Sequence, residues 1–182
     1  MGIQSRHTTS RVAVVDMSFP TDLENYMSTR LFTSSSLAAL NPRTNRADMR
    51  TQNTPRVLYI EDHEDTRELV TLVLEQRSYE VVTSSTIESG IELARSQEFD
   101  LYLLDSWLPD GSGLDLCRQI REFDRVTPIV FYSAAAYEID KSQALNSGAQ
   151  AYLIKPSQPS ELCNVVTSLI ETNSSHYQRV AV

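Results

Sequence analysis

The sequence predicts an α/β fold in which a doubly wound, five-stranded parallel sheet carries helices on both faces. Two observations predict it. Four apolar runs of four residues are separated by stretches in which apolar residues recur at helical spacing. The runs do not alternate between apolar and polar residues, which is typical of strands buried on both faces. Right-handed crossovers between such strands distribute the helices over both sides of the sheet.

The predicted elements follow one another without a long gap. Strands are predicted at 57–60, 80–83, 101–104, 129–132 and 151–154. Helices are predicted at about 65–77, 86–96, 112–122, 137–146 and 159–172. Gly148 is expected to end the fourth helix, and Pro159 suits the first turn of the last, where its missing N–H has no helical partner to lose.

The spacing of apolar residues also predicts which side of each helix is buried. The expected inward residues are Leu69, Leu72 and Val73 in the first helix, Ile87, Ile91 and Ala94 in the second, Leu114, Cys117 and Ile120 in the third, and Leu162, Val165, Val166, Leu169 and Ile170 in the last. The two cysteines, Cys117 and Cys163, have no metal-ligand spacing and are interpreted as buried small hydrophobic residues.

The chain divides into three parts. Residues 1–55 are rich in Ser, Thr, Asn and Arg, and we expect a mostly disordered N-terminal extension with one short helix at about 21–32. The apolar run Val12–Val15 also stands out in this extension. Residues 56–172 are the folded domain, and 173–182 are a C-terminal tail.

Charge and composition exclude several classes of protein. The formal net charge of the 182 residues is −8, and the region from Arg56 onward holds twenty acidic and ten basic residues. A domain this acidic is not expected to bind nucleic acid directly, because such binding requires Lys and Arg to neutralise phosphates. Neither an apolar stretch of membrane-spanning length nor a signal peptide is evident in the sequence, so a cytoplasmic location is expected.

Charged and hydroxyl side chains follow the predicted strands at their carboxyl ends. Glu61 and Asp62 follow the first strand, Asp105 the third, Ser133 the fourth and Lys155 the fifth. These strand ends line the ligand crevice of doubly wound sheets. Three neighbouring carboxylates need a cation, and oxygen ligands favour Mg²⁺, with Mn²⁺ as an alternative. A carboxylate such as Asp105 can accept a phosphoryl group, and the ammonium of a lysine such as Lys155 can stabilise the negative charge of that group.

Taken together, these motifs resemble the receiver domain of two-component response regulators. The resemblance covers about residues 56–172 and rests on Glu61-Asp62, Asp105, Leu108-Pro109 with Ser112-Gly113, Ser133-Ala134, and Tyr152-Leu153-Ile154-Lys155-Pro156. It implies a flavodoxin-like sheet with strand order 2-1-3-4-5. Ser78 departs from the family, which usually has glycine after the first helix.

The resemblance also implies a role for each site residue. Asp105 would be the phosphorylated residue, and Asp62, Asp105 and the main-chain carbonyl of Trp107 would ligate the metal, with Glu61 acting directly or through water. Lys155 and Ser133 would contact the phosphoryl group, Tyr152 would change rotamer on activation, and Lys155-Pro156 would be a cis peptide.

Each role has an ordinary structural alternative. Glu61 and Asp62 could be solvated acids at the start of a helix, Ser133 a turn residue, and Tyr152 part of the core. Lys155 could be a surface lysine. His63 is interpreted as a solvent-facing loop residue rather than as a metal ligand or a phosphohistidine.

The expected function is that of a stand-alone receiver in phosphorelay signal transduction. Its partners would be a histidine kinase or a histidine phosphotransfer protein and a downstream protein target, and a homodimer is left open. It is not expected to be an enzyme beyond slow self-dephosphorylation. One alternative is a degenerate receiver that binds partners without phosphorylation. A second is an aspartate-nucleophile phosphatase, which is disfavoured because Trp107 stands where the second Asp of such an enzyme should be. A third is a flavin-binding electron carrier, but the sequence lacks the phosphate-binding loop of such a protein.

Overall fold

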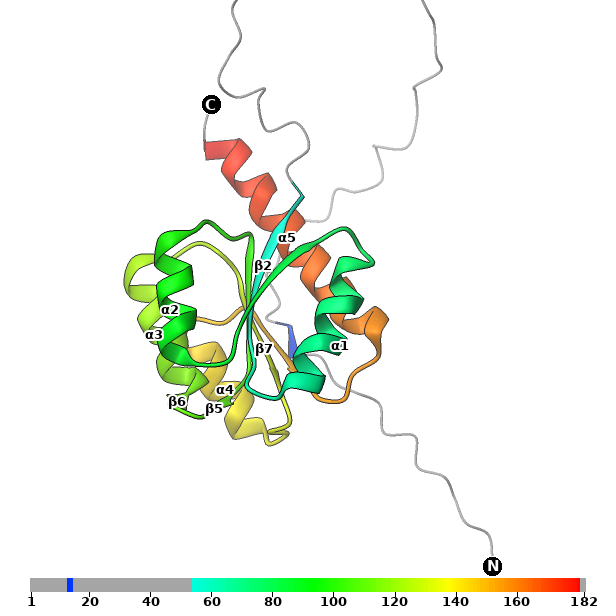
Figure 1. Ribbon diagram of the computed structural model, residues 1–182. Coiled ribbons are helices and arrows are strands. Elements are labelled where there is room, and N and C mark those ends of the chain that lie inside the picture. Colours follow the sequence, from blue (N-terminus) through cyan, green and yellow to red (C-terminus); the bar gives the residue numbers. More distant parts are fainter. Residues whose placement is uncertain (1–12, 15–53, 181–182) are drawn as a thin grey trace, which may run out of the picture. The chain divides into compact units, whose positions relative to one another are not determined.

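The computed structural model describes residues 13–14 and 54–180, with side chains described from 54 to 174. The helix predicted at 21–32 lies outside the described residues. Figure 1 shows a central sheet with helices on both sides. This is the doubly wound α/β architecture that the sequence predicts.

The sheet contains five parallel strands and one antiparallel strand. The parallel strands lie side by side in the order β3 (Glu80–Ser84), β2 (Arg56–Ile60), β4 (Leu101–Leu104), β7 (Ile129–Ser133) and β8 (Ala151–Ile154). Numbered along the chain from β2, this is the predicted order 2-1-3-4-5. The sequence analysis did not predict the sixth strand, β1 (Ala13–Val14), which pairs antiparallel with β8 so that Ala13 lies opposite Tyr152.

The helices are α1 (Glu64–Glu75), α2 (Ile87–Ser96), α3 (Gly113–Phe123), α4 (Glu138–Asn146) and α5 (Pro159–Val180). The first four begin and end within two residues of the predicted bounds. The last continues to Val180 instead of ending at Thr172. No glycine or proline stands between 173 and 180 to interrupt it, so the expected tail begins as helix.

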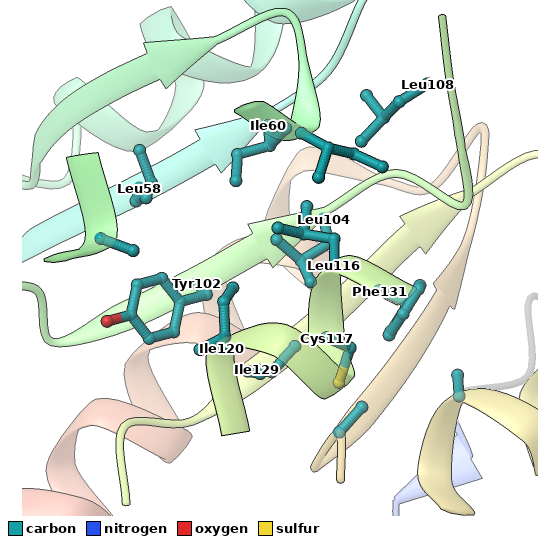
Figure 2. Close-up of a cluster of buried hydrophobic side chains, with 14 of the residues drawn as sticks. Leu58, Ile60, Tyr102, Leu104, Leu108, Leu116, Cys117, Ile120, Ile129 and Phe131 are labelled. Carbon is teal, nitrogen blue, oxygen red and sulfur yellow. The ribbon is translucent and has the colours of Figure 1, made fainter. Parts of the chain in front are cut away.

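Two apolar clusters bury the two faces of the sheet. Helices α1 and α5 cover one face, while α2, α3 and α4 cover the other (Figure 1). Successive strand residues alternate between the clusters, because side chains of a strand point to opposite faces in turn. Leu58 and Ile60 of β2, for example, pack with Leu116 and Ile120 of α3 in the cluster drawn in Figure 2.

The buried side of α1 differs from the prediction. Leu69 and Leu72 are 62% and 54% exposed, whereas Val70 and Leu74 are buried and Val73 is half-buried. Apolar residues at 69, 70, 72, 73 and 74 form two overlapping stripes, so helical spacing alone did not decide between them. In α3, Leu116 is fully buried although it was not predicted to be.

Three turns shape the ends of these elements. Ser78, after α1, has a φ of 63°, in the left-handed region that glycine occupies more readily, and Gly148, after α4, has a φ of 106° as expected of a helix terminator. After β4, the short strands β5 (Trp107–Leu108) and β6 (Gly111–Ser112) form an antiparallel hairpin that the sequence analysis did not predict.

Candidate functional site

The site lies at the carboxyl ends of β2, β4 and β8, and strand alternation brings its residues together. Glu61, Asp105 and Lys155 each follow one of these strands. The residues two positions earlier all belong to the cluster under α1 and α5: Tyr59, Leu103 and Leu153. Because residues two apart point to the same face of a strand, the three charged side chains converge above that cluster.

Lys155 links two of the carboxylates. Its Nζ donates hydrogen bonds to Oε2 of Glu61 and, at 3.1 Å, to Oδ1 of Asp105. Glu61 is 2% exposed and Asp105 is 8% exposed, so both carboxylates lie largely out of water. Buried charges of this kind need charged partners or several hydrogen bonds, and the ammonium group provides the first.

The three carboxylates form a group that could hold a metal ion. One ligand atom each from Glu61, Asp62 and Asp105 lies within 4.8 Å of the others, and Asp62 is exposed to solvent. Three negative charges and the single ammonium of Lys155 leave an excess of two negative charges at this spot. An oxygen-only donor set with an exposed side fits a hard divalent cation that retains water.

Main-chain contacts keep the site in place. Arg67 of α1 donates from Nη1 to the carbonyl oxygens of Glu61 at 2.8 Å and Asp62 at 3.1 Å. Gly113, at the start of α3, lies so close to the main chain after β4 that a Cβ there would be 2.0 Å from the carbonyl oxygen of Asp105. The sequence analysis assigned no role to Arg67. Its spacing of six residues from Glu61 gives no recognisable signal.

Ser133 and Lys155 stand at neighbouring strand ends, as predicted. The Lys155 N–H donates to the Ser133 carbonyl at 2.8 Å, and Lys155-Pro156 is a cis peptide, as predicted. The Ser133 hydroxyl is buried and accepts the Ala135 N–H at 3.3 Å, which leaves its own proton for another acceptor.

Tyr152 is a core residue with a polar contact at one end. Its ring is fully buried and stacks on Phe131, with centroids 5.9 Å apart. Its hydroxyl donates to the carbonyl of Ala135 at 2.7 Å, in the loop that follows Ser133. The side chain therefore connects the loop after Ser133 to the core.

Trp107 and His63 border the site from exposed positions. Trp107 is 69% exposed, and its main-chain N–H points to Oδ2 of Asp105 at 3.4 Å. His63 is exposed at the N-terminus of α1, and its Nδ1 lies 3.2 Å from the Thr66 hydroxyl. The solvent-facing interpretation of His63 is thus confirmed.

The structure adds two polar residues that the sequence analysis did not single out. Tyr59 donates its hydroxyl to Oε2 of Glu61 at 2.8 Å. Burial, followed by the negative charge of Glu61, raises the pKa of the Tyr59 phenol above its ordinary value, so the group remains a donor. Asp110, in the β5–β6 turn, accepts the N–H groups of Ile87 and Glu88 at 2.9 and 3.0 Å and so caps α2. Although burial alone would raise it, these hydrogen bonds lower the pKa of Asp110.

Comparison with known proteins decides the family. The family described as "Response regulator receiver domain" matches residues 57–167 of the chain. The chain belongs to this family. The resemblance drawn from the strand-end motifs is therefore confirmed, and the receiver covers the whole sheet except β1.

Individual response regulators agree with this assignment. The chain is 35% identical to the response regulator ArlR of Staphylococcus saprophyticus over 63% of its own length and 52% of the relative. It is also 35% identical to the cell cycle response regulator CtrA of Brucella ovis, over 69% of its own length and 54% of the relative. The chain thus spans about half the length of these curated relatives.

Solved structures show the same fold. The non-phosphorylated HemR receiver domain of Leptospira biflexa matches with a TM-score of 0.60 and 34% identity, over 64% of this chain and 94% of that one. A CheY-like receiver domain protein of Methanospirillum hungatei matches with a TM-score of 0.66 and 24% identity, over 68% and 99%. Among the described residues of this receiver, no helix has the length and apolar character needed to cross a membrane.

Proposed function

We propose that this receiver accepts a phosphoryl group on Asp105 from a histidine kinase or a histidine phosphotransfer protein, and that phosphorylation changes which downstream protein it binds. One observation carries the proposal. Asp105 follows β4, its carboxylate lies beside the Lys155 ammonium, and its ligand atom lies within 4.8 Å of those of Glu61 and Asp62. The proposed nucleophile, the ammonium and the proposed metal ligands therefore lie together, as phosphoryl transfer to a carboxylate requires.

The proposed reaction is a displacement at phosphorus. A carboxylate oxygen of Asp105 forms the new bond to phosphorus, while the bond from phosphorus to the donor's imidazole nitrogen breaks and its electron pair stays on the imidazole. The Lys155 ammonium, now shared between Glu61 and Asp105, stabilises the charge on the phosphoryl oxygens. The buried hydroxyl of Ser133 is the second proposed donor to those oxygens.

The proposed metal is Mg²⁺, with Mn²⁺ as an alternative. Glu61, Asp62, Asp105 and the main-chain carbonyl of Trp107 would hold it, with Glu61 binding directly or through water. When bound, the ion would neutralise the two negative charges that Lys155 leaves uncompensated. The hard oxygen donors and the exposed position of Asp62 support this choice.

The biological setting follows from the same proposal. The receiver would work in the cytoplasm, as a phosphoacceptor with at most slow self-dephosphorylation and no further enzymatic activity. Tyr152, whose hydroxyl holds the Ala135 carbonyl, would change rotamer as the loop after Ser133 rearranges around the phosphoryl group. Association of two receivers is one form that the partner interaction could take.

Mass spectrometry of the intact protein tests the proposal. Incubation with acetyl phosphate and Mg²⁺ should add one phosphoryl mass to the wild type and none to Asp105→Asn. Asp115→Asn is the matched control, because it removes the same charge from an exposed residue of α3 that pairs with Arg118. It should be labelled like the wild type.

Two results would contradict the proposal. Equal labelling of Asp105→Asn and wild type would remove Asp105 from the reaction. Absence of labelling in the wild type, with kinase and with small phosphodonors, would favour a receiver that binds its partners without phosphorylation.

A further inference from the structure

Tyr59 is a buried core residue whose hydroxyl contacts Glu61 of the site. Its ring is fully buried in the cluster under α1 and α5, two positions before Glu61 on the same strand face. Its hydroxyl donates to Oε2 of Glu61 at 2.8 Å. We propose that Tyr59 is a positioning residue of the phosphoacceptor site, which holds the Glu61 carboxylate where it can share a cation with Asp62 and Asp105. The inference rests on the proposed function.

Glu61 needs such a partner because of its length and burial. A glutamate side chain has more rotatable bonds than an aspartate, so fixing it in one place costs more conformational entropy. Its carboxylate is nearly inaccessible to water, and it accepts three hydrogen bonds: from Tyr59, from Lys155 and, at 3.3 Å, from the His63 N–H. A carboxylate held by three donors occupies one position rather than several.

The contacts of Tyr59 and Lys155 meet at the same oxygen atom. Both donate to Oε2 of Glu61, whereas the His63 N–H points to Oε1. When Lys155 turns to a phosphoryl group, Oε2 would lose the ammonium and keep only the phenol. Tyr59 therefore prevents Glu61 from becoming a buried carboxylate with an unsatisfied oxygen at the step in which Lys155 is needed elsewhere.

The ring of Tyr59 is a rigid support for this contact. It lies on an interior strand of the sheet, β2, which is flanked by β3 and β4, and Tyr59 pairs with Thr83 and Leu103 in these two neighbouring strands. A phenol has few torsions to lose, and its hydroxyl position is determined by the packing of the ring. The hydrogen bond to Glu61 is therefore directed by the core rather than by the loop.

The test compares two tyrosines that make the same kind of bond at different places. Tyr102 of β4 is also buried, and its hydroxyl donates to Oδ2 of Asp124 at 2.9 Å, in the loop that precedes β7 and thus at the opposite end of the sheet from the site. Tyr59→Phe and Tyr102→Phe each remove one hydroxyl and keep the ring. Mg²⁺ affinity is measured by titration calorimetry on the full chain, and stability by urea denaturation.

We expect Tyr59→Phe to weaken Mg²⁺ binding by about tenfold to a hundredfold, the range expected for losing one hydrogen bond to a charged group. The variant should still be phosphorylated when Mg²⁺ is raised to saturation. The two variants should lose similar amounts of stability, because each loses one buried hydrogen bond. Tyr102→Phe, however, should keep an Mg²⁺ affinity within about twofold of wild type. Unchanged or tighter Mg²⁺ binding by Tyr59→Phe, or equal weakening in both variants, would overturn the inference.

A double-mutant cycle tests whether Tyr59 acts through Glu61. In a Glu61→Gln background, which keeps the shape of the side chain, Tyr59→Phe should change Mg²⁺ affinity by less than about twofold. The full effect in that background would show that Tyr59 acts by another route. The proposed function is tested separately, because labelling of the wild type and of Asp105→Asn decides it whatever the tyrosine variants do to Mg²⁺ affinity.

Discussion

Substitution of Gly113 by alanine should both destabilise the receiver and displace Asp105. An added Cβ would lie 2.0 Å from the carbonyl oxygen of Asp105 and 3.0 Å from its carbonyl carbon. Since nonbonded heavy atoms prefer about 3.5–4.0 Å, the two main-chain segments must separate by about 1.5 Å or more. Neither atom belongs to a side chain that could rotate away. We therefore expect a loss of about 3 kcal/mol, the upper part of the range for overpacking.

Gly90 of α2 provides the matched control. A Cβ there would meet Cδ1 of Ile60 at 2.5 Å, which is the end of a side chain and can move. The cost of that movement, about 1 kcal/mol, is offset by the gain of about 1 kcal/mol when alanine replaces glycine inside a helix. Gly90→Ala should therefore lie within about 1 kcal/mol of wild type.

Urea denaturation of the two variants measures this difference, and labelling by acetyl phosphate measures its consequence. A displacement of about 1 Å at a reacting group can slow a reaction by about a hundredfold, so Gly113→Ala should be labelled far more slowly than Gly90→Ala. If Gly113→Ala is as stable as wild type within about 0.5 kcal/mol, or if Gly90→Ala loses just as much, the reasoning from the close approach is wrong.

Three further predictions concern the turns and the loop beside the site. Ser78→Gly should raise the free energy of unfolding by about 1 kcal/mol in urea denaturation, because Ser78 has a φ of 63° that costs a residue with a Cβ; an unchanged or lower value would contradict this. Asp110→Ala should lower that free energy by about 1 kcal/mol, because Ile87 and Glu88 lose their cap, and Asp110→Asn should recover part of the loss. Trp107 is the only tryptophan, and we expect its fluorescence to change saturably with Mg²⁺ and again on phosphorylation. A signal that stays constant while calorimetry detects Mg²⁺ binding would show that the indole does not sense the site.

The site could be predicted from the sequence because its residues follow apolar runs directly. Once Glu61, Asp105 and Lys155 are placed at the ends of parallel strands, the topology of the sheet brings them to one edge. Residue type then suggested the chemistry. The strand order and the helix bounds followed from the same alternation of strands and helices, together with the resemblance that it supported.

The features that the sequence analysis missed depend on contacts that the spacing of apolar residues does not predict. Tyr59 stands inside an apolar run, so it was counted as core, although its position two residues before Glu61 on a strand could have suggested their contact. On α1, leucines occur on both candidate faces, and only packing against the sheet and α5 shows that Val70 rather than Leu69 is buried. The pairing of Ala13 with Tyr152 joins residues far apart in the chain.

That pairing affects how the sheet meets other molecules. The edge of a sheet offers unpaired N–H and C=O groups to which a foreign strand can add, and proteins protect such edges. Here β1 occupies the border of β8 at Ala151 and Tyr152. The border at β3 has no neighbouring strand within the described part of the chain, but it carries Glu80, an exposed acid whose carboxylate lies 2.9 Å from Arg56. The β8 edge is thus covered by β1, and the β3 edge carries a charged residue. In a chain shortened to begin at residue 54, the β8 edge would become open to strand addition, whereas the β3 edge would be unchanged. The tendency of that shortened chain to self-associate should therefore rise.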